Sequence, residues 1–188
     1  MKGDLTLAVT LDRTILWLML LALAGVLTAA MGFQYFDREI PCPLCLLQRV
    51  AMFGCCFGLM QQLSGGETQR GAGIAMISTV LLLIISVRQT LLDIFPRAGH
   101  AYIGRAVFGV HMPVWSVLIA AALLLGFAVR LALFGGPKSA PPAEGSIFHR
   151  LSYGLGLYVI IICAINCLSV LVQCGLGECH TTGYALLR

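Results

Sequence analysis

Five long apolar runs dominate the sequence and restrict the folds that it can adopt. They lie at about 14–32, 45–63, 71–94, 113–134 and 151–173. Each is close to the roughly 20 residues that an α-helix needs to cross the hydrocarbon core of a bilayer. Inside lipid every backbone N–H and C=O group must be satisfied within the segment itself, so such runs form helices. The sequence therefore predicts an all-α membrane protein, a bundle of five transmembrane helices.

Composition and charge agree with a membrane protein and exclude a nucleic-acid-binding protein. Of the 188 residues, 59% are hydrophobic and 11% are charged, whereas about 25% are charged in an average soluble domain. The formal net charge is +4, but the basic residues are scattered singly between apolar runs. A nucleic-acid-binding surface needs basic residues clustered on one face, which this pattern lacks.

Two segments between the runs differ from the rest of the chain. Residues 134–146, FGGPKSAPPAEGS, have the Pro, Gly and Ser content of a flexible connector, and they separate the first four helices from the fifth. Residues 95–113 are too polar to span a membrane, yet they carry several apolar side chains: Tyr102, Ile103, Val107, Phe108 and Val110. We interpret them as an interfacial segment, either a short helix on the outer surface or an irregular loop interrupted by glycines.

The eight cysteines fall into two groups. Inside the apolar runs, where reduced cysteine packs as a small hydrophobic residue, lie Cys55, Cys56, Cys163 and Cys167. The other four lie at run ends among Pro, Gly and polar residues. We call Cys42 and Cys45 the turn pair, and Cys174 and Cys179 the tail pair. These four cysteines are the candidates for redox chemistry.

Five crossings place the two termini on opposite sides of the membrane, so the turn pair and the tail pair lie on the same side. Once Arg49 and Arg88, which fall within helices, are set aside, Lys and Arg are slightly in excess inside if the N-terminus is cytoplasmic. Paired thiols persist as disulfides on the oxidising face of a membrane. We therefore expect a cytoplasmic N-terminus, with both cysteine pairs and the C-terminus on the periplasmic or extracellular face.

The turn pair has the surroundings of a reactive dithiol. Pro41 and Pro43 stiffen a turn, and a helix that begins near Leu44 leaves its unpaired N–H groups and positive dipole end beside Cys45. Arg49 follows Cys45 by four residues and so lies on the same helical face. Both effects favour a thiolate at Cys45. The arginine is then either an anchor that reaches to lipid head groups or a cation that binds a carbonyl of a lipid-soluble cofactor.

The tail pair has the spacing of a feasible disulfide, because Gly175 and Gly177 let the chain fold tightly between the two sulfurs. It is either a structural staple or a redox pair that a soluble partner can reach. Covalent haem is a weaker alternative, since the spacing before His180 resembles a relative of the C-x-x-C-H signature but the nine residues after Cys179 supply no pocket. Zinc bound by Cys42 and Cys45 is a further alternative, since enough partner ligands lie on the same face, but a bundle in lipid has little need of a structural metal. Those ligands are Cys174, Cys179, His180, His100 and His111. We therefore expect no metal.

Two dithiols on one face suggest an electron relay. Thiol–disulfide exchange moves two electrons per step, from a soluble dithiol to the tail pair and then to the turn pair. A quinone in the membrane is the obvious acceptor of two electrons and two protons from the turn pair.

The octapeptide CPLCLLQR at 42–49 and the segment HMPVW at 111–115 resemble the disulfide bond formation protein B (DsbB) family over about residues 14–134. The resemblance implies a four-helix bundle in the bacterial inner membrane. Such a bundle reoxidises a periplasmic thioredoxin-fold dithiol oxidase (DsbA-like) and passes the electrons to ubiquinone or menaquinone. By position, Cys45 would meet the quinone, Cys42 would accept the exchange, Arg49 would bind the quinone and Gln48 would lie near its ring.

This sequence departs from the family pattern in one respect. The family carries its second cysteine pair in the loop between the third and fourth helices, whereas residues 95–112 contain no cysteine. We hypothesise that the fifth helix restores the pair from the C-terminus. The expected division is therefore a quinone-binding bundle at 1–134, a cytoplasmic linker at 135–150, and a fifth helix with a periplasmic cysteine-containing tail at 151–188.

Two alternatives belong to other classes of protein. One is a non-catalytic membrane subunit or assembly factor that binds metal or haem through its Cys and His residues. The other is a protein like vitamin K epoxide reductase, also a quinone-linked bundle. In that family the active C-x-x-C lies on the last core helix, whereas here it precedes the second, which favours the DsbB-like interpretation.

Overall fold

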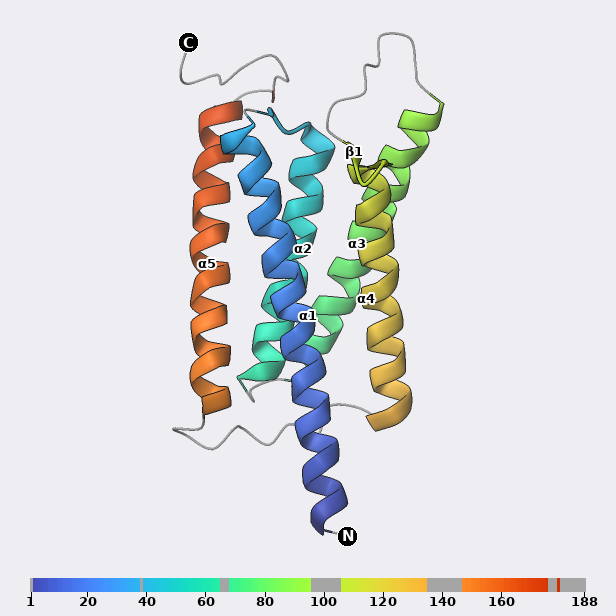
Figure 1. Cartoon of the computed structure of the whole chain (residues 1–188), viewed down its shortest axis with the longest axis vertical. Coiled ribbons are helices and arrows are strands. Elements are labelled where there is room, and N and C mark those ends of the chain that lie inside the picture. The colour runs from blue at the N-terminus through green and yellow to red at the C-terminus, as the bar shows by residue number, and fades with distance from the viewer. Residues whose placement is uncertain are drawn as a thin grey trace.

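The computed structural model describes residues 2–37, 39–64, 68–95, 106–134 and 147–175, together with residue 179. These residues form five α-helices and one short β-hairpin (Figure 1). The helices are α1 (Lys2–Phe36), α2 (Pro43–Leu63), α3 (Thr68–Ile94), α4 (Met112–Phe134) and α5 (Ile147–Cys174). The hairpin consists of β1 (Ala106–Val107) and β2 (Val110–His111).

All five helices are long and apolar enough to cross a membrane, which confirms the predicted all-α membrane protein with a fifth helix after the first four. The ends of α2, α3 and α4 fall where the apolar runs end. The helix α1 differs most, because it begins at Lys2 although its apolar run begins near residue 14. A helix satisfies its own backbone hydrogen bonds, so it can continue beyond the hydrocarbon core into polar sequence.

The helix α2 lies at the centre of the bundle, with α1, α3 and α5 packed against it. Its most extensive contact is with α3, and glycines allow the two backbones to approach closely. A Cβ atom added at Gly71 would lie 2.7 Å from the carbonyl oxygen of Gly58, and one added at Gly54 would lie 2.5 Å from Ser78 Oγ. Helices in lipid associate through packing, so small residues at the contact bring the helices together.

Both cysteine pairs lie at one end of the bundle. This end, at the top of Figure 1, holds the C-terminal end of α1, the N-terminal end of α2, the hairpin and the C-terminal end of α5. We call it the sulfur end. The N-terminus of the chain lies at the opposite end, as five crossings predict. The helix α5 packs against α1 and α2, so it contacts the bundle beside the turn that carries the turn pair.

Within the described part of the segment after α3, residues 106–111 form a hairpin. Ala106 pairs with His111 and Val107 with Val110, and the residues between them, Phe108 and Gly109, have φ angles of 53° and 75°. Two consecutive positive φ angles form the tight turn that matches the twist of a two-stranded hairpin. Trp115 in α4 donates a hydrogen bond to the carbonyl oxygen of Val107 at 3.0 Å. Residues 96–105, including His100, lie outside the described residues.

The predicted linker lies largely outside the described residues as well, at 135–146. The helix α5 begins at Ile147, a few residues before its apolar run.

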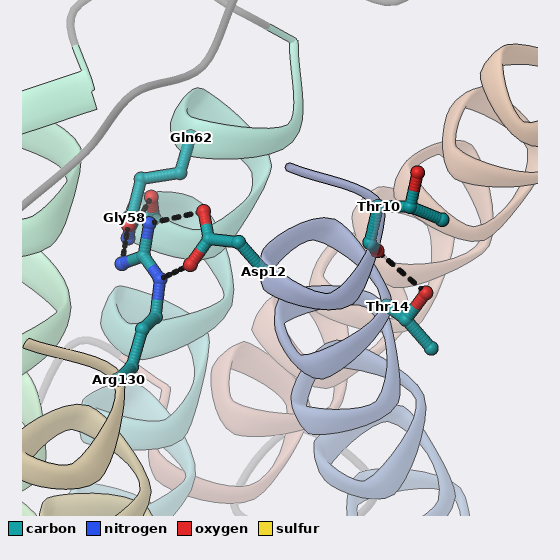
Figure 2. A network of polar contacts seen from close by, with 6 residues as sticks. All are labelled: Thr10, Asp12, Thr14, Gly58, Gln62 and Arg130. Carbon is teal, nitrogen blue, oxygen red and sulfur yellow. Dashed lines mark hydrogen bonds and ion pairs between the residues drawn. The ribbon is translucent and has the colours of Figure 1, made fainter. Parts of the chain in front are cut away.

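A buried ion pair joins three helices at the end opposite the sulfur end (Figure 2). Arg130 of α4 is 3% exposed and Asp12 of α1 is 6% exposed. The Arg130 guanidinium donates to both Asp12 carboxylate oxygens, at 2.5 and 3.1 Å, and to Gln62 Oε1 of α2 at 2.5 Å. The Gln62 amide donates in turn to the carbonyl oxygen of Gly58 at 3.3 Å. The charges are thus paired and hydrogen-bonded, as buried ions require.

Candidate functional site

The turn pair is a disulfide at the N-terminus of α2. Cys42 is the N-cap residue of α2, and Pro43 occupies the first helical position, where its missing N–H is not needed. The backbone N–H of Cys45 donates to Cys42 Sγ at 3.1 Å. The helix therefore begins slightly earlier than the sequence indicates, and its first turn donates a hydrogen bond to the sulfur of Cys42 and not to that of Cys45.

A cavity of about 530 Å³ adjoins the turn pair, and it lies between α1, α2, α4 and the hairpin. Both cysteines, Gln48 and Arg49 line it. Most of the remaining wall is apolar and includes Val26, Phe33, Met52, Met112, Trp115 and Ile119. All four sequence-predicted residues of the turn therefore meet in a single cavity that has room for a ring.

Arg49 is buried inside the bundle, where its guanidinium is hydrogen-bonded to other helices. It is 7% exposed. Its Nη1 donates to Gln34 Oε1 at 2.6 Å and to Asn166 Oδ1 at 3.2 Å, and its Nη2 donates to the carbonyl oxygen of Ala30 at 2.9 Å. These acceptors lie on α1 and α5, so the two helices fix the guanidinium at the cavity wall.

The helix α5 supplies a row of polar side chains that the sequence analysis did not single out. Asn166 accepts from Arg49, and Ser169 Oγ lies 2.5 Å from the Nε2 atom of Gln34. Gln173 Nε2 donates to the carbonyl oxygen of Pro41 at 2.8 Å. The fifth helix therefore supports both the arginine and the turn that carries the turn pair.

A second group that the sequence analysis missed lies on α3 and α4. Gln89 Nε2 is 3.4 Å from both Cys42 Sγ and Cys45 Sγ. Gln48 Nε2 donates to Gln89 Oε1 at 2.9 Å, and Ser116 Oγ donates to Gln48 Oε1 at 3.2 Å. Gln48 lines the cavity, and it also orients the side chain that contacts the sulfurs.

The tail pair is also a disulfide, as its spacing permits. Cys174 is the last residue of α5, and it follows Gln173 directly. Gln173 is hydrogen-bonded to Pro41, the residue before Cys42. This contact keeps Cys174 close to the segment that carries the turn pair. His180, considered above as a ligand, lies outside the described residues.

The remaining four cysteines are free, as predicted. Cys55 and Cys56 are buried in the bundle, and Cys55 Sγ accepts a hydrogen bond from Thr79 at 3.3 Å. Cys163 is half-buried and Cys167 is exposed on α5. Within the part of the chain that the structure describes, His, Cys, Asp and Glu side chains form no group of three or more that could hold a metal ion.

Comparison with known proteins identifies relatives of this chain. The family model for disulfide bond formation protein DsbB matches residues 12–101. Disulfide bond formation protein B 1 of Burkholderia lata is 27% identical over 155 residues, which cover 69% of this chain and 90% of the relative. Disulfide bond formation protein B of Burkholderia thailandensis is 35% identical over 81 residues, which cover 43% of this chain and 46% of the relative.

A third relative, disulfide bond formation protein B of Cupriavidus metallidurans, is 30% identical over 89 residues, 47% of this chain and 55% of the relative. The chain thus spans most of one of these relatives and about half of the other two. No solved structure matches the chain significantly. The helix α5 lies outside the residues that the family model matches.

Proposed function

We propose that the chain is a member of the disulfide bond formation protein B family, whose model matches residues 12–101. We propose further that it is a thiol:quinone oxidoreductase that sustains disulfide bond formation. It is a multi-pass membrane protein. We place it in the bacterial inner membrane, with its N-terminus in the cytoplasm and the sulfur end at the periplasmic face. There it reoxidises a thioredoxin-fold dithiol oxidase.

The main observation in support of this proposal is that the turn pair and Arg49 line the same cavity. The turn-pair disulfide and the Arg49 guanidinium line the same space of about 530 Å³. A reactive sulfur pair and a fixed cation therefore border a single ligand-sized volume at the end of the bundle.

The cavity suits a quinone, either ubiquinone or menaquinone. Its volume lies within the roughly 300–1,000 Å³ of small-molecule sites, and its apolar wall with a few polar groups is typical of them. Arg49 and Gln48 would hold the quinone, because the guanidinium and the amide can donate hydrogen bonds to carbonyl oxygens. When bound, a quinone supplies an acceptor for two electrons and two protons.

Each cysteine of the turn pair has its own role in this proposal. Cys42 accepts the incoming thiolate, and the S–S bond to Cys45 breaks as the new bond forms. The electron pair of the broken bond remains on Cys45 Sγ, which becomes the thiolate that faces the cavity. The Arg49 guanidinium stabilises negative charge on this side of the cavity. The second thiol of the incoming dithiol then displaces Cys42 from the mixed disulfide, which leaves both cysteines of the turn pair reduced. Oxidation of this dithiol to the Cys42–Cys45 disulfide gives up two electrons and two protons, which a bound quinone would accept.

The tail pair links the turn pair to the soluble partner. The partner's dithiol reduces the Cys174–Cys179 disulfide and is itself oxidised to a disulfide. The resulting tail dithiol reduces the Cys42–Cys45 disulfide, so two electrons move in each exchange. The hydrogen bond from Gln173 to Pro41 supports this order, because it keeps the C-terminal end of α5 beside the turn.

We expect the tail pair to be needed for protein dithiols and dispensable for small ones. In a Cys174→Ser/Cys179→Ser variant, quinol formation with a reduced periplasmic thioredoxin-fold oxidase as donor should fall at least about tenfold. Dithiothreitol reaches the turn pair directly, so its rate should stay within about twofold of the parent. Quinol formation by the purified protein in detergent, with a short-chain quinone and each donor in turn, measures both rates.

A Cys163→Ser/Cys167→Ser variant is the matched control, because it removes two free cysteines of the same helix. It should keep both activities. If the variant that lacks the tail pair oxidised the protein donor as fast as the parent, the tail pair would be a structural staple and the relay would be wrong. If the parent formed no quinol with either donor, the proposed function would be wrong.

A further inference from the structure

A chain of hydrogen bonds from α4 through α2 to α3 ends at the turn-pair disulfide. It runs from Ser116 to Gln48, then to Gln89, and from Gln89 Nε2 to the two sulfurs. The two glutamines are 7% and 6% exposed. Three helices are therefore arranged so that a buried amide group contacts both atoms of one disulfide.

These hydrogen bonds all run in one direction, from donor to acceptor, and this direction fixes the orientation of the Gln89 amide. An amide carbonyl oxygen accepts hydrogen bonds and an amide nitrogen donates them. Gln48 Nε2 donates a hydrogen bond to the carbonyl oxygen of Gln89, so the NH₂ group of Gln89 faces the sulfurs. Ser116 Oγ in turn donates a hydrogen bond to the carbonyl oxygen of Gln48. Because burial makes an unsatisfied amide costly, these contacts hold the donor in place.

A donor in this position acts differently on the two redox states of the turn pair. A disulfide sulfur is a weak acceptor, whereas a thiolate accepts a charge-assisted hydrogen bond that is roughly twice as strong as a neutral one. The Gln89 amide therefore stabilises the reduced, thiolate-containing state more than the oxidised state. A contact with this preference helps the disulfide to open.

We propose that Gln89 is a catalytic residue whose amide N–H groups stabilise the thiolate formed when the turn-pair disulfide opens. The inference rests on the proposed function in assigning redox chemistry to this pair. As the incoming thiolate binds Cys42 and the Cys42–Cys45 bond breaks, the electron pair stays on Cys45 Sγ. Gln89 donates a hydrogen bond to this sulfur, and no proton is transferred. Gln48 and Ser116 are positioning residues, since they act through Gln89.

The test measures the redox equilibrium of the turn pair without quinone and without partner. In a Cys174→Ser/Cys179→Ser background, the pair is equilibrated with dithiothreitol buffers, alkylated, and its oxidised fraction is measured by mass spectrometry. Gln89→Leu should lower the equilibrium constant for reduction about tenfold, which corresponds to a potential about 30 mV more negative. Gln89→Glu should lower it at least as far, because a carboxylate cannot donate and repels a thiolate.

Two further variants separate this role from a general effect on packing. Ser116→Ala should shift the constant in the same direction but by less, because it only loosens the orientation of Gln48. Thr90→Val is the matched control on α3, since the Thr90 hydroxyl donates to the Ser86 carbonyl of its own helix and not to a sulfur. It should leave the constant within twofold of the background. Thermal unfolding followed by tryptophan fluorescence checks that each variant is folded.

A folded Gln89→Leu and a folded Gln89→Glu that both keep the background constant within twofold would overturn the inference. The same holds if Thr90→Val shifted the constant as far as Gln89→Leu. Failure of the proposed function has a different signature, which is a parent protein that forms no quinol. A parent that forms quinol, with Gln89 variants of unchanged equilibrium, would refute the role of Gln89 alone.

Discussion

A Cys45→Ser variant is expected to lose quinol formation with every dithiol donor, to below about one-thousandth of the parent rate. A serine hydroxyl neither forms a disulfide nor exchanges with one, so Cys42 has no partner with which to form a disulfide. The turn pair therefore cannot pass two electrons to a quinone in the cavity. Cys42 is then a free thiol with no disulfide bond to exchange, so a reduced donor should form no mixed disulfide with it. Quinol formation monitored by absorbance, with dithiothreitol and with the protein donor, measures the loss.

Cys167→Ser provides the comparison for this experiment, because it makes the same chemical change at an exposed free cysteine on α5. It should retain the parent rate with both donors. Quinol formation that survived Cys45→Ser would exclude Cys45 as the residue that delivers electrons to the cavity.

An Arg130→Met variant is expected to destabilise the bundle by about 3–5 kcal/mol, the usual cost of removing one partner of a buried ion pair. The loss would leave the Asp12 carboxylate and Gln62 Oε1 inside the protein without the donor that now satisfies them (Figure 2). Loss of helical circular dichroism during titration of detergent-solubilised protein with sodium dodecyl sulfate measures the change.

The double variant Asp12→Leu/Arg130→Met distinguishes an unpaired charge from lost packing. It removes both charges, so it should recover most of the stability that Arg130→Met loses. Coupling between the two sites, taken from the four-variant cycle, isolates their interaction. A double variant as unstable as the sum of the two single variants would contradict the ion pair as the cause.

The helices could be predicted from the sequence because the length of an apolar run and the need to satisfy the backbone in lipid are local properties. The hairpin could not be predicted as readily. Its turn places Phe108 at a positive φ angle, a conformation that is uncommon for a bulky residue. The interfacial assignment of 95–113 rested on apolar content, and apolar content alone does not distinguish a hairpin from a helix.

The turn residues could be predicted as neighbours because they are close in sequence. Four residues along a helix bring Arg49 to the face of Cys45, whatever the other helices do. Gln89 and Asn166 approach the same place from α3 and α5, which depends on how each helix is rotated and packed. Their presence inside apolar runs was the available signal, because polar side chains at membrane depth are commonly functional.

The ion pair at the opposite end illustrates the same limit. Asp12 lies just before the first apolar run, and Arg130 lies near the end of the fourth, so both resemble charges that flank a membrane. Only the packing of α1 against α4 brings them together inside the bundle.

The most direct test of electron transfer from the turn pair is a single turnover in the Cys174→Ser/Cys179→Ser variant. The protein is fully reduced, freed of reductant, mixed without oxygen with one equivalent of short-chain quinone, then alkylated and mapped by mass spectrometry. We predict one quinol for each Cys42–Cys45 disulfide that forms. Quinone that stayed oxidised, or quinol that formed while both cysteines remained open to alkylation, would contradict the proposed function.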